Sequence, residues 1–125
     1  MRKPTKHSLT RKLDHLWAEI TRSRGECAWC KTTSGLEAAH IFSRRYRAVR
    51  WDLLNGVLLC HKHHFYAHAN PVLFAEFVKS YLGEYNYEKL KKSAQMTTKW
   101  TITDLEEIYA NLLRIKNPGQ RENDD

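Results

Sequence analysis

The residues best suited to chemistry gather between residues 27 and 68, in about a third of the chain. This segment holds all three cysteines and five of the seven histidines. Thiolates and imidazoles are the side chains that bind zinc and related divalent ions in proteins. Packing alone does not explain such a density, so the segment predicts metal-dependent chemistry.

Two pairs of residues have the spacing of a structural zinc site. Cys27 and Cys30 form a Cys-x-x-Cys pair, and Cys60 and His63 are separated by the same gap. A tetrahedral zinc ion takes four such ligands, commonly as two close pairs from different segments. The odd number of cysteines argues against a disulfide scaffold, while a redox-active or merely buried cysteine pair is the alternative. We therefore predict a structural Zn²⁺ on these four residues.

The histidines after Cys60 predict a second metal site. On a helix that begins at His61, residues His64 and His68 lie one turn apart on one face and can bind an ion together. His63 is rotated from His64 by about 100°, so these neighbours can serve two different metals. His61 is the member most readily explained as an ordinary surface histidine, although His61 or His64 can also replace His63 at the zinc.

An arginine-rich segment lies between the two halves of this cluster. It contains Arg44, Arg45, Arg47 and Arg50, with Tyr46 and Trp51 among them. Such cations neutralise phosphates, which supplies most of the non-specific affinity of a protein for nucleic acid. A solvated charged loop is the alternative, but the neighbouring metal ligands favour DNA contact. Tyr46 is suited to stack on a base or to fill the core, and we assign Trp51 to the core.

The overall composition fits this interpretation. A chain of 125 residues fits one domain, and its net charge of +7 with a pI near 9.5 predicts an acidic partner, most commonly nucleic acid. The sequence has no apolar run of about eighteen residues, so we expect no membrane span. The basic N-terminus is not followed by an apolar stretch, which predicts a cytoplasmic protein without a secretory signal.

Apolar periodicity predicts a mostly helical chain around a small pair of strands. Helical spacing covers 9–23, 71–82, 87–95 and 103–116, and another helix runs from His61 to the Asn70-Pro71 boundary. Short strands are expected over 36–42, ending at or near His40, and over 57–59. We expect Asn70 and Thr103 to cap the helices that follow them. Residues 1–8 and 117–125 are expected to be disordered tails, without a second domain between them.

The order of these motifs resembles the HNH endonucleases of the ββα-metal class. The resemblance rests on the Cys-x-x-Cys pair, the Ala39-His40 strand, the basic loop, Asn55 and the segment from Leu59 to His64, and it covers roughly residues 27–90. The sequence flanking these motifs is similar to phage recombination nucleases of the NinG (Rap) type.

The resemblance implies an α+β fold that is mostly helical. A small zinc-stabilised ββα-metal core, at about 27–70, would be embedded among several helices, with a helical C-terminal part at 71–116. Both parts would belong to a single nuclease domain over 9–116. It also implies cleavage of DNA phosphodiester bonds to 5′-phosphate and 3′-hydroxyl ends.

The resemblance also implies a role for each matching residue. His40 would be the general base that takes a proton from the attacking water. Asn55 would brace the loop that follows the His40 strand. His64 would bind the catalytic divalent ion, Mg²⁺, Mn²⁺ or another, with His68 as a second ligand. Many members carry a further metal ligand where this chain has Ala39, and Glu37 is only a weak substitute for it.

Together with these residues, the resemblance implies a metal-dependent DNA endonuclease or nickase, encoded by a phage or prophage and acting in DNA recombination or processing. It would act on duplex or branched DNA with little base readout, in a bacterial or phage-infected cell, and an oligomer is possible. A zinc-stabilised nucleic-acid-binding module without catalysis is the alternative, favoured by Ala39. A metal-storage protein would explain the histidines but not the arginines or Asn55.

Overall fold

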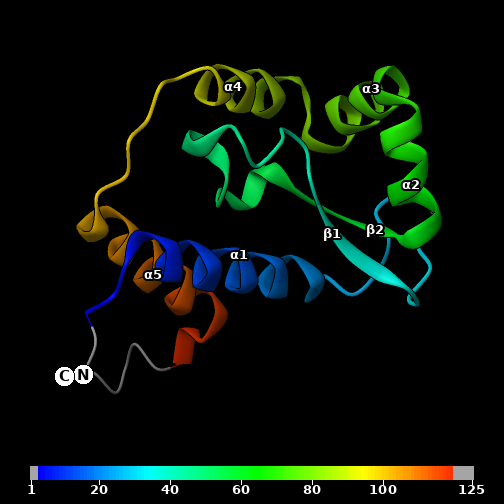
Figure 1. Cartoon of the computed structure of the whole chain (residues 1–125). Helices are drawn as coiled ribbons and strands as arrows, with labels where there is room; N and C mark the ends of the chain where they lie inside the picture. Colours follow the sequence, from blue (N-terminus) through cyan, green and yellow to red (C-terminus); the bar gives the residue numbers. More distant parts are fainter. Residues whose placement is uncertain (1–2, 120–125) are drawn as a thin grey trace.

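The computed structural model describes residues 3–119 and has five helices around a two-stranded sheet (Figure 1). In chain order the elements are α1 (Lys6–Arg22), β1 (Leu36–His40), β2 (Gly56–Cys60), α2 (His61–Ala69), α3 (Pro71–Leu82), α4 (Glu84–Ala94) and α5 (Ile102–Lys116). Two short 3₁₀ turns, η1 (Arg47–Val49) and η2 (Leu53–Asn55), lie in the connection between the strands. The expected α+β, mostly helical class is confirmed.

The two strands and the helix after them form a ββα unit. β1 and β2 pair antiparallel, with Leu36 opposite Cys60 and His40 opposite Gly56. α2 starts immediately after β2, because the Cys60 side chain caps it by accepting from the His63 backbone N–H. The ends of the hairpin therefore differ in chemistry: Cys60 and α2 lie at one end, and His40 lies at the other.

The hydrophobic core of the described residues has three parts: two flank the sheet, and a third is formed by Val49 of η1 with Leu90 and Ala94 of α4. Helices α1 and α5 lie side by side in Figure 1 and bury a shared set of apolar residues, Leu9, Leu13, Leu16, Trp17, Leu105 and Leu112. A second group packs between the hairpin and α2 and includes Val57, Leu59, Cys27 and Ala67. Because β2 is buried along its whole length, it joins these two parts and fixes the hairpin between α1 and α2.

Several helix ends differ from the sequence-based expectation because other residues cap them. α1 begins at Lys6, since Thr5 and Ser8 form a reciprocal capping box. Thus residues 6–8 are helical where a disordered tail was expected, and residues 1–2 lie outside the described part. α5 begins at Ile102, capped by Thr101 rather than by Thr103.

Two further boundaries are shifted in the second half of the chain. α4 begins at Glu84, directly after Gly83, instead of near 87. Asn70 precedes α3 as expected, but its side chain makes no capping hydrogen bond. Of the expected C-terminal tail, residues 120–125 lie outside the described part. Within residues 3–119, no helix has the length and apolar character to cross a membrane.

Candidate metal centre and catalytic pocket

The structure brings the four predicted zinc ligands together. Cys27 and Cys30 lie in the turn after α1, Cys60 ends β2, and His63 is in the first turn of α2. Their donor atoms all lie within 4.8 Å of one another. The Cys30 and Cys60 sulfurs are 3.8 Å apart, and His63 Nδ1 is 3.2 Å from the Cys60 sulfur and 4.0 Å from the Cys27 sulfur.

These separations fit a tetrahedral metal site. Zinc–sulfur and zinc–nitrogen bonds of ordinary length place neighbouring donors about 3.5–3.8 Å apart. Burial raises the pKa of the Cys27 thiol, but backbone hydrogen bonds from Cys30 and Cys60 outweigh it and lower the pKa to about 7. The thiolate, which is the metal-binding form, is therefore accessible at neutral pH. In residues 3–119 this is the single cluster of three or more such ligands whose donor atoms converge.

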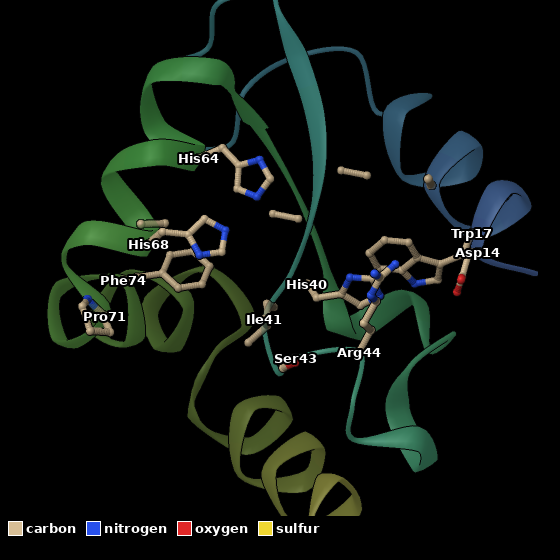
Figure 2. Close-up of a pocket in the computed structure, with 14 residues that line it drawn as sticks. Asp14, Trp17, His40, Ile41, Ser43, Arg44, His64, His68, Pro71 and Phe74 are labelled. Atoms are coloured by element: carbon tan, nitrogen blue, oxygen red, sulfur yellow. The ribbon is translucent and has the colours of Figure 1, made fainter. Parts of the chain in front are cut away.

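A cavity of about 680 Å³ is lined by the predicted residues His40, His64, His68 and Arg44 (Figure 2), whereas Asn55 is buried outside it. His40 comes from the end of β1, His64 and His68 come from α2, and Arg44 comes from the loop after β1. Figure 2 shows His40 beside Trp17 of α1, whereas His64 and His68 extend from α2 on the other side of β1. One cavity thus has a histidine on one flank and a histidine pair on the other.

His40 is held in one orientation and one tautomer. Its ring stacks on Trp17, with centroids 3.9 Å apart and planes 7° from parallel. His40 Nε2 lies 3.1 Å from the carbonyl oxygen of Arg50. Because a carbonyl only accepts, Nε2 carries the hydrogen of the neutral ring and Nδ1 keeps its lone pair. Burial lowers the pKa of His40, so the ring is neutral and able to accept a proton at pH 7.

An ion pair behind His40 fixes the carbonyl that it contacts. Arg50 donates two hydrogen bonds to Asp14, from Nε at 3.0 Å and from Nη2 at 2.7 Å. Trp51 Nε1 donates to the same carboxylate at 2.9 Å. Burial raises the pKa of Asp14, but the hydrogen bonds from Arg50 and Trp51 outweigh it, and the net shift is downward. Arg50, predicted to contact DNA, thus has its guanidinium engaged within the protein.

Asn55 ties together the two ends of the arginine loop. Its side chain is fully buried, accepts from the Phe42 backbone N–H at 2.7 Å, and donates to the carbonyls of Phe42 at 2.9 Å and Val49 at 3.1 Å. The backbone carbonyl oxygen of Asn55 accepts a hydrogen bond from the Ile41 backbone N–H at 2.9 Å. These bonds hold the chain directly after His40, where the expected bracing role requires them.

Glu37 contacts two of the four α2 histidines, His61 and His64, one through each carboxylate oxygen. His64 Nδ1 lies 2.7 Å from one oxygen, and His61 Nδ1 lies 3.0 Å from the other. The hydrogen bonds from His61 and His64 lower the pKa of Glu37, so it is ionised and accepts from both rings. His64 therefore keeps its lone pair on Nε2, the arrangement in which a carboxylate orients a metal-binding histidine. The His64 and His68 ring centroids are 5.0 Å apart.

The remaining three arginines of the loop are exposed. Arg44 lines the cavity, and the Arg45 guanidinium lies over the Tyr46 ring, 5.1 Å from its centroid. Arg47 lies one turn further, where its carbonyl accepts from Trp100 Nε1 at 3.0 Å. Trp51 is buried in the core as expected. The exposed cations are thus those that precede Arg50 in the chain.

Sequence reasoning missed two supporting residues, Asp14 and Trp17. Both lie on the helix α1, whose apolar stripe marks it as a packing helix. An acid among basic residues and a tryptophan at a core position carry no signal of a nearby histidine. Glu37 was weighed only as a substitute metal ligand, and the structure instead pairs it with His61 and His64.

Comparison with known proteins identifies a similar family for this part of the chain. Residues 19–66 match a family model described as HNH endonuclease. The match includes the metal cluster, His40, Asn55 and His64, and it stops before His68. Searches of curated proteins and of solved structures find no match. The segment that forms the metal centre, the hairpin and the start of α2 is therefore similar to the HNH endonucleases, over less than half of the chain.

Proposed function

We propose that this protein is a metal-dependent HNH endonuclease or nickase that hydrolyses DNA phosphodiester bonds. One observation carries the proposal: the cavity that contains His40, with Nδ1 free to accept a proton, also contains His64 and His68. A phosphodiester in this cavity would have a proton acceptor on one flank and cation ligands on the other. That is the pair of functions that hydrolysis of a phosphodiester needs.

His40 acts as the general base. Its Nδ1 takes a proton from the attacking water, and the bond from Nε2 to the Arg50 carbonyl persists in the imidazolium that results. The Trp17 ring and the Asp14–Arg50 pair hold the imidazole in place, while Asn55 fixes the chain after it. Asp14, Trp17, Arg50 and Asn55 are positioning residues, since each acts through His40 or its strand.

Two metals serve different purposes in this proposal. Cys27, Cys30, Cys60 and His63 hold a structural Zn²⁺ that links the turn after α1 to the start of α2. His64 and His68 hold a catalytic ion, Mg²⁺, Mn²⁺ or another divalent cation, and Glu37 orients His64. A divalent cation bound there supplies positive charge that stabilises the phosphoryl oxygens and the leaving 3′ oxygen.

DNA is bound mainly through its backbone. Arg44 lines the cavity, Arg45 and Arg47 follow it in the same loop, and all three are exposed and suited to neutralise phosphates. No separate element projects to read base edges among the described residues, which favours duplex or branched DNA with little sequence preference. The flanking sequence, similar to the NinG (Rap) type, supports a phage or prophage enzyme of DNA recombination or processing in the cytoplasm of its bacterial host.

Nicking of supercoiled plasmid tests this function. We expect the zinc-loaded protein to nick DNA when Mg²⁺, Mn²⁺ or Ni²⁺ is added, and His40→Ala to lose activity by about 10²–10⁴-fold, the usual contribution of a general base. His15→Ala is the matched control, because His15 is exposed on α1 outside the cavity. Full activity of His40→Ala, with its fold checked by circular dichroism, would exclude His40 as the base.

A non-catalytic DNA-binding module is the second candidate, favoured by Ala39. This buried alanine lines the cavity where many HNH enzymes carry a further metal ligand, so a bound cation would have few protein ligands. If the wild-type protein and His40→Ala bind DNA equally and neither cuts plain or branched substrates with any of the three cations, the binding function stands instead.

A further inference from the structure

A second cavity, of about 360 Å³, lies beside the same arginine loop. Three segments that are far apart in sequence form it: the start of α1, the loop around η1, and the connection into α5. Its charged and aromatic lining comes from Lys6, Arg47, Arg50, Lys99, Trp51 and Trp100. It shares no lining residue with the His40 cavity, so it is a separate site.

The charged side chains that line this cavity are all positive. No carboxylate lines it, and of its four Lys and Arg side chains only Arg50 has an acidic partner among the described residues, namely Asp14. Lys6, Arg47 and Lys99 are exposed at its walls without an ion pair inside the described part of the chain. A cleft lined by cations and backed by apolar walls concentrates the electrostatic field and attracts an anion.

The cavity is held in shape by its aromatic residues. Trp100 Nε1 donates to the carbonyl of Arg47, and the Trp51 and Trp100 rings lie 6.5 Å apart at 48°. This contact joins the connection before α5 to the arginine loop. The cations therefore converge because of tertiary packing. Without this packing, the three segments that carry them would not be held together.

We propose that this second cavity binds a backbone phosphate of the DNA whose cleaved bond lies at His40. The inference rests on the proposed function, because it takes DNA as the ligand. Arg44 lines the first cavity and Arg47 the second, and their Cα atoms are at most about 11 Å apart along the chain. With a rise of about 3.4 Å per nucleotide on one strand, about 11 Å corresponds to about three nucleotides, so the second phosphate lies a few nucleotides from the cut.

Removal of two of these charges tests the site. Lys6→Gln/Lys99→Gln neutralises two exposed cations of the cavity and leaves the His40 cavity unchanged. Lys62→Gln/Lys89→Gln is the matched control, because both lysines are exposed and line neither cavity. Binding to a duplex oligonucleotide is measured between 50 and 200 mM salt, with the structural zinc retained and no free divalent cation in the buffer.

We expect the cavity variant to bind about tenfold more weakly at the low-salt end, and the slope of log K against log salt to fall by about 1 to 2. The control pair should change neither quantity. In addition, replacing single phosphates by uncharged methylphosphonates should weaken wild-type binding at one position a few nucleotides from the cut. The cavity variant should have lost that sensitivity.

The outcomes separate this inference from the proposed function. Equal affinity and slope in the two double variants overturn the phosphate site, even if the wild-type protein nicks plasmid. A selective loss in the cavity variant supports the site, and it does so even if no cutting is found and the protein is a binding module. Absence of DNA binding by the wild-type protein overturns both.

Discussion

At the scale of single residues, His40 combines two features that suit a proton acceptor. The hydrogen bond from Nε2 to the Arg50 carbonyl leaves Nδ1 unprotonated, and burial against Trp17 lowers the pKa of the ring. Both features favour the neutral imidazole. They also make His40 a source of pH-dependent stability, since a neutral, half-buried histidine resists protonation.

The pH dependence of stability follows from this lowered pKa. Above the ordinary histidine pKa of 6.5, both the folded and the unfolded chain have a neutral His40. As the pH falls through 6.5, the unfolded state binds the proton first, so stability is lost down to the lower folded pKa. Urea unfolding between pH 5 and 8 should therefore show a weaker acidic decline in His40→Gln than in wild type. Parallel curves for the two proteins would contradict this assignment.

At the scale of elements, the contact between α1 and β2 positions the hairpin. Gly56 opens β2 opposite His40, and a Cβ atom there would lie 2.9 Å from both Thr21 Oγ1 and Trp17 Cζ2. Trp17 is also the ring on which His40 stacks. The absence of a side chain at Gly56 therefore lets the strand approach the helix that supports the proposed base.

Gly56→Ala should therefore disturb both stability and activity. The added methyl group overpacks a buried contact, and we expect a loss of about 1–3 kcal/mol in the free energy of unfolding. Gly119→Ala is the control, since a Cβ atom there meets nothing within 4 Å and should change stability by less than about 0.5 kcal/mol. Urea unfolding measures both variants, and equal stabilities would show that β2 can move away from α1.

Much of this fold follows from local patterns in the sequence. The strands, the start of α2 and the end of α3 at Gly83 are close to their expected places, because apolar spacing and turn residues are local signals. The starts of α1 and α5 were misplaced. The capping boxes at Thr5 and Thr101 compete with other polar residues nearby, and the sequence does not rank them.

At the scale of the whole molecule, the metal cluster joins the N-terminal half to α2, the helix that carries the proposed catalytic ligands. Cys27 and Cys30 follow α1, whereas His63 is adjacent to His64 on α2. The second core part around Cys27, Cys60 and Ala67 is small, so a bound metal contributes much of its folding energy. Among the described residues, the buried apolar cluster of α1 and α5 includes none of the four metal-cluster residues.

Removal of the structural metal should thus destabilise the hairpin and α2 more than the α1–α5 core. A strong chelator is expected to lower the melting temperature by roughly 10 °C or more, since each kcal/mol shifts it by several degrees in a domain of this size. Nicking should be lost and should return with added Zn²⁺ plus Mg²⁺, but not with Mg²⁺ alone. Circular dichroism during chelation checks the unfolding. An unchanged melting temperature after complete metal removal would show that the cluster is not structural.

By itself, the sequence predicted which residues could carry chemistry: the four residues of the metal cluster, the histidine pair at helical spacing, and the four arginines of the loop. Their positions depend on short spacings and on the period of one helix, which are properties of local sequence. The same local information predicts the two short strands, whereas their pairing was expected from the resemblance. The sequence could not assign partners to side chains on different elements.

Only the tertiary structure decided those partners. Arg50 pairs with Asp14 of α1, Glu37 contacts His61 and His64 of α2, and Lys6 and Lys99 line one basic cavity. Each arrangement joins residues far apart in the chain, and packing of α1 and α5 against the hairpin sets their distances. No local spacing encodes such a contact, because it depends on how whole elements pack.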